Sequence, residues 1–216
     1  MDNTYVARPT TPGPHPLVLV GFEMFGVTDY IRQVADRLAG AGYLAVVPDF
    51  YHGVTFPETA EGRAAGLAKL RDLTGDGVVA DVRSTVRRHG DGTPVAMVGV
   101  SAGAHLGYYA ASRVPMRALA AFYPGWLTDT TLRLSPGPVL GLTPGIAAAG
   151  TRLLVLLGED DHLYTAAGRA DLAGALGTDL VVYPHTPHGF FCHTRSTYRP
   201  AEADDAWRRV MTLLRG

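Results

Sequence analysis

Short apolar runs recur along the chain and predict the strands of a buried sheet. Nearly every position in them is apolar, and they cover residues 17–22, 44–48, 95–100, 118–123, 152–158 and 179–184. Strands that are covered by helices on both faces have this pattern, because neither face of the sheet meets water. We therefore predict a mostly parallel sheet, and residues 4–7 (TYVA) are a candidate for a short extra strand at its edge.

The stretches between these runs have the periodicity of amphipathic helices. One helical face is formed by Val78, Val79, Val82 and Val86, and another near the C-terminus by Trp207, Val210, Met211 and Leu214. Strands that alternate with helices predict an α/β fold. In such a fold the sheet is doubly wound, the crossovers are right-handed and helices cover both faces.

Residues 1–216 are predicted to form a single domain, because no linker or internal repeat interrupts the pattern. The least regular part is residues 127–150, which are rich in proline, glycine and apolar side chains. This segment is either an ordinary surface loop or a lid or pocket wall, since long loops in compact domains are often functional. The sequence leaves both interpretations open.

Composition and charge narrow the class of partner. The 216 residues carry a formal net charge of −1, which offers no electrostatic footprint for nucleic acid or for an anionic membrane. Cys192 is the only cysteine, so an intramolecular disulfide is excluded. The first residues lack the basic and apolar regions of a signal peptide, and no apolar run is long enough to span a bilayer. We expect a cytoplasmic monomer or small homo-oligomer.

The apolar run at 95–100 ends in a Gly-x-Ser-x-Gly motif, residues 99–103 (GVSAG), and an alanine-rich helical segment follows at once. A strand, a sharp turn and a helix are the setting in which this motif carries a nucleophilic serine. Strand and helix approach so closely there that a Cβ two positions from the serine would clash, and the serine itself is strained. The motif therefore predicts that Ser101 projects at the carboxyl end of the sheet, where ligands bind.

A serine hydroxyl is a poor nucleophile unless a base takes its proton, and two later strand ends supply candidates. Residues 159–162 (EDDH) follow the run at 152–158, while His185 and His188 follow the run at 179–184. The chain order of nucleophile, acid and base is typical of α/β-hydrolases. These residues alone leave open which acid and which histidine take part.

Histidines and acids gather in the same two loops, which raises a metal site as an alternative. Pro187 argues against a helical His-x-x-His face at residues 185–188, and no second pair of ligands has the spacing of a zinc site. We therefore expect neither a metal nor a cofactor. Cys192 is not favoured as a nucleophile, because no strand-to-helix bend precedes it.

Four segments together resemble the dienelactone hydrolases, a family of the α/β-hydrolase superfamily. Residues 21–53 are similar to the family's first strand, its Glu-x-Phe-Gly loop, its first helix and the following strand. Residues 99–104 (GVSAGA) resemble its nucleophile elbow, and residues 158–164 (GEDDHLY) resemble its Gly-x-x-Asp acid loop. Residues 188–214 resemble its His-Gly-Phe segment and terminal helix. The resemblance covers most of the chain and implies an α/β-hydrolase fold and an ester or lactone hydrolase.

The resemblance implies a role for each matched residue. Ser101 corresponds to the nucleophile. His188 corresponds to the base, because it precedes Gly-Phe, and Asp161 to the acid, because it stands three residues after Gly158. Together these would make a Ser-Asp-His catalytic triad.

The family's oxyanion hole implies the backbone N–H groups of Met24 and Ala102. Side chains near the same strand ends complete the expected substrate pocket. They are Glu23, Phe25, Tyr51, Trp126 and Phe190.

The serine changes the expected role of Glu23. Founding members of the family have cysteine at the elbow, where Glu23 would correspond to a glutamate beside the resting thiolate. A carboxylate next to a developing oxyanion opposes it. Glu23 must therefore turn away from Ser101, hold a proton or pair with a cation.

A second departure concerns the substrate. Family members that act on dienelactone have an arginine four residues after the base, where this chain has Cys192. Arg195 lies nearby, and Arg63 or Arg71 could face the site, but none stands at a matched position. Residues 127–150 are also longer than the family norm. An uncharged ester or lactone is therefore expected in place of dienelactone.

Three hypotheses of function follow. The leading one is a serine hydrolase that cleaves a small ester or lactone through an acyl-enzyme. The second is a non-hydrolytic acyl transferase, cyclase or rearrangement catalyst in small-molecule biosynthesis that uses the same pocket. The third is a non-catalytic binder of small molecules on a hydrolase scaffold, since a fold does not determine a function.

Overall fold

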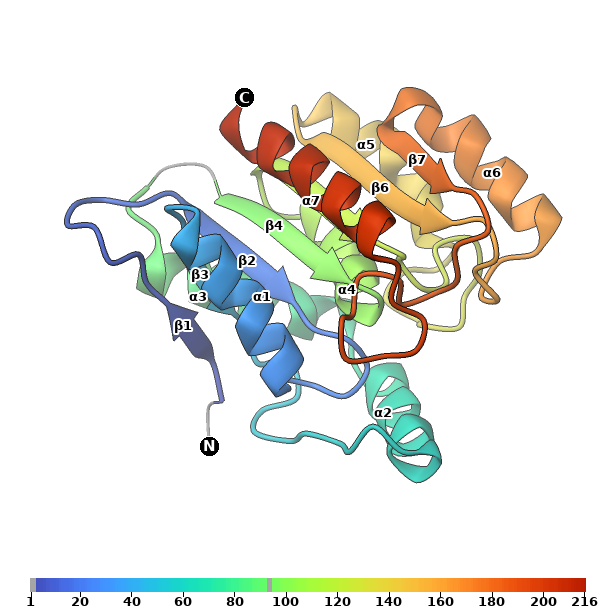
Figure 1. The fold of residues 1–216 in the computed structure, drawn as a ribbon, viewed down its shortest axis with the longest axis horizontal. Coiled ribbons are helices and arrows are strands. Elements are labelled where there is room, and N and C mark those ends of the chain that lie inside the picture. The colour runs from blue at the N-terminus through green and yellow to red at the C-terminus, as the bar shows by residue number, and fades with distance from the viewer. Residues whose placement is uncertain (1–2, 93–94) are drawn as a thin grey trace.

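One sheet of seven strands runs through the part of the chain that the computed structural model describes, residues 3–92 and 95–216. The strand order is β1-β3-β2-β4-β5-β6-β7 (Figure 1). Neighbouring strands are parallel throughout, except that β1 pairs antiparallel with β3. The strands are β1 (Tyr5–Ala7), β2 (Leu17–Gly21), β3 (Leu44–Val47), β4 (Val95–Val100), β5 (Met116–Phe122), β6 (Arg152–Gly158) and β7 (Leu180–Tyr183).

Helices cover both faces of the sheet. In Figure 1, α1 and α7 lie in front of the sheet, while α3 and α4 lie behind it. Contacts agree, since α1 packs on β1, β2 and β3, α7 on β5 and β6, and α4 on β2, β4 and β5. The helices are α1 (Asp29–Gly40), α2 (Ala60–Arg71), α3 (Gly75–His89), α4 (Ala102–Ala111), α5 (Thr143–Ala148), α6 (Ala166–Leu176) and α7 (Pro200–Arg215).

The strands are buried in the way the apolar runs predict. Every residue of β2 and of β4 is buried, because helices cover both faces of these central strands. All six runs form strands, and the edge candidate at 4–7 forms β1. The fold class predicted from the sequence, a mostly parallel α/β sheet with helices on both faces, is confirmed.

Parallel strands bring distant loops to one edge of the sheet. The carboxyl ends of β2 and β4–β7 lie along this edge, so the loops that follow them meet there. Glu23 follows β2, Ser101 follows β4, Tyr123 follows β5, Asp161 follows β6 and His188 follows β7. These loops form the candidate active site.

Residues 127–150 are more regular than their composition predicts. They contain a 3-10 turn, η1 (Val139–Leu142), which leads directly into α5. Their apolar side chains at Leu127, Val139 and Ile146 are buried, and the hydroxyl of Tyr108 on α4 bonds that of Thr143. The segment therefore packs against the helix that follows Ser101, and its action as a lid stays a prediction.

No helix in the described part of the chain is both long enough and apolar enough to cross a bilayer.

Candidate active site

Ser101 stands on a strained turn between β4 and α4. Its backbone has φ 52° and ψ −113°, a conformation that L side chains rarely adopt. Gly99 and Gly103 make the turn sterically accessible. A Cβ at Gly99 would lie 2.7 Å from the nitrogen of Ala104, and one at Gly103 would overlap the backbone of Gly21 on β2. Residues 99–103, here called the elbow, therefore require glycine at positions 99 and 103.

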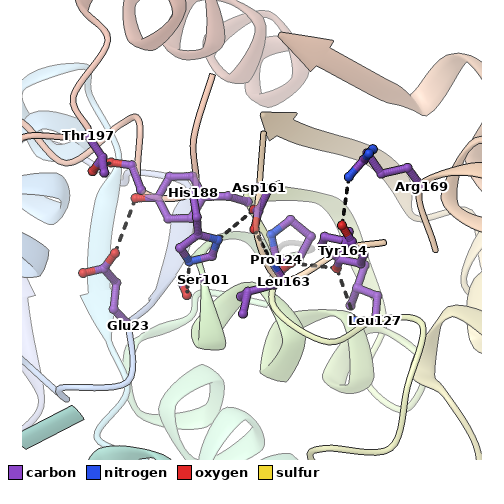
Figure 2. A network of polar contacts seen from close by, with 12 residues as sticks. Glu23, Ser101, Pro124, Leu127, Asp161, Leu163, Tyr164, Arg169, His188 and Thr197 are labelled. Carbon is purple, nitrogen blue, oxygen red and sulfur yellow. Dashed lines mark hydrogen bonds and ion pairs between the residues drawn. The ribbon is translucent and has the colours of Figure 1, made fainter. Parts of the chain in front are cut away.

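A hydrogen-bonded relay joins Ser101 to two distant loops (Figure 2). The Ser101 Oγ lies 3.0 Å from His188 Nε2, and His188 Nδ1 lies 2.7 Å from Asp161 Oδ2. Asp161 is 1% exposed, and its other oxygen accepts the N–H of Leu163 at 3.0 Å. A carboxylate that accepts the Nδ1 proton leaves the lone pair of Nε2 facing the hydroxyl. This arrangement can take a proton from Ser101.

Among the acids and histidines that the residues alone left open, only some are in hydrogen-bond contact with Ser101 or with its histidine partner. Asp160 and His185 are exposed, and the backbone N–H of His185 donates to Glu159 Oε2 at 3.2 Å. His185 also has a φ of 51°, which places it in a tight turn before the histidine that meets Ser101. Asp161 and His188 are the pair that the relay contains.

The family resemblance predicts that the backbone N–H groups of Ala102 and Met24 face an oxyanion. Ala102 is the first residue of α4, and the first N–H groups of a helix have no partner within it. The loop after β2 that carries Met24 is held by Tyr51, whose hydroxyl donates to Met24 O at 3.0 Å. Tyr51 is 1% exposed, so its side chain supports this loop from within the core.

Glu23 takes the third of the three states expected for it, because it pairs with a cation. Arg195 Nη1 donates to Glu23 Oε1 at 2.8 Å, and Arg195 Nη2 donates to Oε2 at 2.5 Å. Arg195 Nε also donates to Glu58 Oε2 at 3.1 Å. Glu23 is 3% exposed, and a buried carboxylate without such a partner would be strongly destabilising. The sequence named Arg195 only as a nearby cation.

Aromatic side chains pack near His188 and near Arg195. The ring of Tyr123 packs edge-on against His188, with centroids 4.9 Å apart. Phe190 packs in turn against Tyr123 at 5.4 Å and is fully buried. Phe25 lies beneath the Arg195 guanidinium, 5.6 Å from ring centroid to carbon, and Trp126 is mostly buried after β5.

Other titratable groups of this region do not join the relay. Cys192 is fully buried, and burial raises the pKa of its thiol, which makes it a poor nucleophile. Within residues 3–92 and 95–216, no group of three or more His, Cys, Asp or Glu side chains is placed to hold a metal ion.

Comparison with known proteins decides the family. A sequence model of the dienelactone hydrolase family matches residues 3–216. The chain belongs to the dienelactone hydrolase family. The resemblance drawn from its motifs is thus confirmed, and this dienelactone hydrolase homologue is a hydrolase of the lactone or ester type.

Relatives of this family member align over nearly its whole length. A "Putative carboxymethylenebutenolidase" of Synechocystis sp. is 32% identical over 229 residues, which cover 97% of this chain and 89% of the relative. A "Probable 2-oxo-3-(5-oxofuran-2-ylidene)propanoate lactonase" of Bradyrhizobium sp. is 27% identical over 221 residues, covering 98% and 88%. The crystal structure of a "Putative Dienelactone Hydrolase" from Klebsiella pneumoniae is similar with a TM-score of 0.84 and 26% identity, covering 97% and 91%.

Proposed function

We propose that this dienelactone hydrolase homologue is a serine hydrolase that cleaves a small, uncharged ester or lactone. The observation that carries the proposal is the relay itself. An alcohol, an imidazole and a carboxylate from three loops lie in hydrogen-bond contact, at 3.0 Å and 2.7 Å. Such a relay on a strained elbow is the arrangement that activates a serine.

In the proposed reaction, His188 Nε2 takes the proton of Ser101 as Oγ attacks the carbonyl carbon. Asp161 keeps the imidazole in its tautomer and stabilises the cation that forms. The tetrahedral oxyanion is held by the N–H groups of Ala102 and Met24. His188 then returns the proton to the leaving alcohol, and water releases the acyl group from Ser101 by the same route.

The magnitudes indicate which parts matter most. General-base action by a positioned histidine is worth about 10²–10⁴ in rate. Each donor of an oxyanion hole is worth roughly 3–4 kcal/mol. Without Ser101 no acyl-enzyme can form, so the whole covalent route is lost.

The charge around Arg195 supports an uncharged substrate. Its guanidinium donates to two carboxylates, those of Glu23 and Glu58. One cation between two anions leaves a negative balance, and a substrate carboxylate would have to displace one of them. Cys192 stands where the resemblance places a substrate-binding arginine. A neutral ester or lactone avoids this competition.

The test combines covalent labelling with turnover. Wild-type protein is treated with a fluorophosphonate and its intact mass is measured, in parallel with hydrolysis of 4-nitrophenyl acetate. A 4-nitrophenyl ester that keeps a free carboxylate serves as the charged counterpart. We expect one label per chain and faster turnover of the neutral ester.

Ser101→Ala is expected to abolish labelling and to lower ester turnover by several orders of magnitude, because the proposed acyl-enzyme forms on Ser101. Its thermal unfolding should match wild type. Ser112→Ala, at the end of the same helix, is the matched control and should keep full activity. Substantial turnover by Ser101→Ala would refute covalent catalysis. Labelling of wild type without ester turnover would favour an acyl transferase or cyclase, and no labelling would favour a binder.

A further inference from the structure

The turn after β5 is strained beside the nucleophile. Two of its residues, Tyr123 and Trp126, have positive φ values of 34° and 57° although neither is glycine. Such conformations cost free energy and persist only where the surroundings hold them. Residues 123–127 are here called the strained turn, and the question is what holds them.

One side chain binds both limbs of the strained turn. The hydroxyl of Tyr164 donates to Pro124 O at 2.7 Å and accepts the N–H of Leu127 at 3.3 Å (Figure 2). These two groups flank the residues Gly125 and Trp126. The hydroxyl therefore satisfies one backbone acceptor and one backbone donor across the bend.

The strained turn is joined in turn to the nucleophile. The N–H of Gly125 donates to the carbonyl of Ser101 at 3.3 Å. The carbonyl of Gly125 accepts the Nδ1 proton of His105 on α4 at 2.9 Å. The turn is thus anchored to the elbow and to the helix that begins there.

Tyr164 itself belongs to the loop that carries the carboxylate of the relay. Its N–H donates to the carbonyl of Asp161 at 3.2 Å, and its own carbonyl accepts Arg169 Nη1 at 2.8 Å. Hydrogen bonds therefore run from Asp161 through Tyr164 and the strained turn to Ser101. The hydrogen bonds from Ser101 to His188 and from His188 to Asp161 complete a closed ring of hydrogen-bonded residues, here called the circuit.

We infer that Tyr164 is a positioning residue, whose hydroxyl sets the distance between the carboxylate side and the serine side of the relay. This inference rests on the proposed hydrolase function. Tyr164 is 5% exposed, and burial raises the pKa of its hydroxyl. The phenol therefore keeps the proton with which it holds Pro124. The sequence motifs assign no role to this residue.

Tyr164→Phe removes only the hydroxyl and tests the inference. We expect kcat for 4-nitrophenyl acetate to fall about 10- to 100-fold, because sub-ångström misplacement of reacting groups is costly. KM should change much less, since the hydroxyl is buried and binds only the backbone of the strained turn. The acidic limb of the pH profile of kcat/KM should move to lower pH, because a displaced Asp161 stabilises the imidazolium less.

Tyr183→Phe is the matched control. Tyr183 is also a buried tyrosine, and its hydroxyl donates to Asp205 Oδ2 at 2.9 Å, outside the circuit. It should lose a hydrogen bond without any change in the pH profile. A merely structural tyrosine at 164 would behave in the same way, and wild-type kcat and pH profile in Tyr164→Phe would overturn the inference.

Circular dichroism and thermal unfolding show whether Tyr164→Phe folds. If it does not fold, Arg169→Met perturbs the same hydrogen-bonded path from a half-buried position, because it removes the hydrogen bond to the carbonyl of Tyr164. A smaller fall in kcat with the same shift of the acidic limb supports the inference, and an unchanged profile overturns it. Failure of the proposed function is distinct, because it appears in wild type as absent labelling and absent ester turnover.

Discussion

His105 shows how burial decides the state of one titratable side chain. It lies on α4 with no exposed surface, and its Nδ1 proton is donated to Gly125 O. Its Nε2 has no hydrogen-bond partner among the described residues. Burial lowers the pKa of His105 to about 4, so the imidazole is neutral near physiological pH. These contacts support a packing role for this histidine.

This buried histidine makes stability depend on pH. In the unfolded chain its pKa is 6.5, whereas in the folded protein it is about 4. Between these pH values the unfolded state binds more protons than the folded state. The contribution of His105 to the stability of the fold is therefore complete above pH 6.5 and is lost as the pH falls toward 4. The loss is on the order of 3 kcal/mol.

His105→Asn places an amide where Nδ1 stands and cannot titrate. As the pH falls through this window, we expect the free energy of unfolding, measured with urea, to fall more steeply for wild type than for His105→Asn. His15→Asn, which removes a histidine from the surface, is the control and should follow wild type. Parallel curves for wild type and His105→Asn would contradict the assignment.

At the scale of elements, the elbow depends on how closely α4 crosses the sheet. Gly103 of α4 and Gly21 of β2 touch through their backbones, and a Cβ on either would overlap the other. Gly107, one turn later on the same helix, faces only the flexible ends of Leu119 and Met97 at 3.1 Å. The crossing of α4 over the sheet is therefore tight at Gly103 and more adaptable at Gly107.

Gly103→Ala is expected to lower the free energy of unfolding by about 1–3 kcal/mol through overpacking. It should also lower ester turnover, because α4 must move together with the N–H of Ala102. Gly107→Ala is the control on the same helix, where higher helix propensity offsets a small side-chain shift. Chemical denaturation and steady-state kinetics measure both effects. Equal stability of the two variants would show that α4 and β2 can move apart enough to accept a Cβ at residue 103.

Sequence patterns predict the strands of this fold but not its short helices. Continuous apolar runs predict β2 to β7 well, because a strand buried on both faces must be apolar throughout. The same logic fails for residues 127–150, where α5 and η1 form among prolines and glycines. Such short helical turns arise from packing against α4 and leave no periodic pattern to read.

At the scale of the whole molecule, Arg195 joins three loops of the candidate site. It comes from the segment after β7, binds Glu23 after β2 and reaches Glu58 before α2. Its side chain is 22% exposed, whereas that of Glu23 is 3% exposed. The ion pair therefore closes over a carboxylate that has little access to water.

Arg195→Met should cost about 3–5 kcal/mol of stability, because it leaves Glu23 as a buried charge without a partner. The double variant Glu23→Gln with Arg195→Met should recover much of this loss. Arg209→Met breaks an exposed pair with Asp205 and should cost about 0–1 kcal/mol. Denaturation of the single and double variants forms a cycle. Additive losses at Glu23 and Arg195 would show that the pair is not coupled.

The sequence by itself determined the α/β fold, the strands and the elbow, because each follows from local patterns of apolar residues and glycines. It also predicted Asp161 and His188 as the acid and the base, through a resemblance to a family that the comparison confirms. Only the tertiary structure decided that Glu23 pairs with Arg195 and that Tyr164 spans the strained turn. The reason is physical: these contacts join side chains from loops that are remote in the chain. Their geometry depends on how the loop backbones turn above the sheet, which no local periodicity encodes.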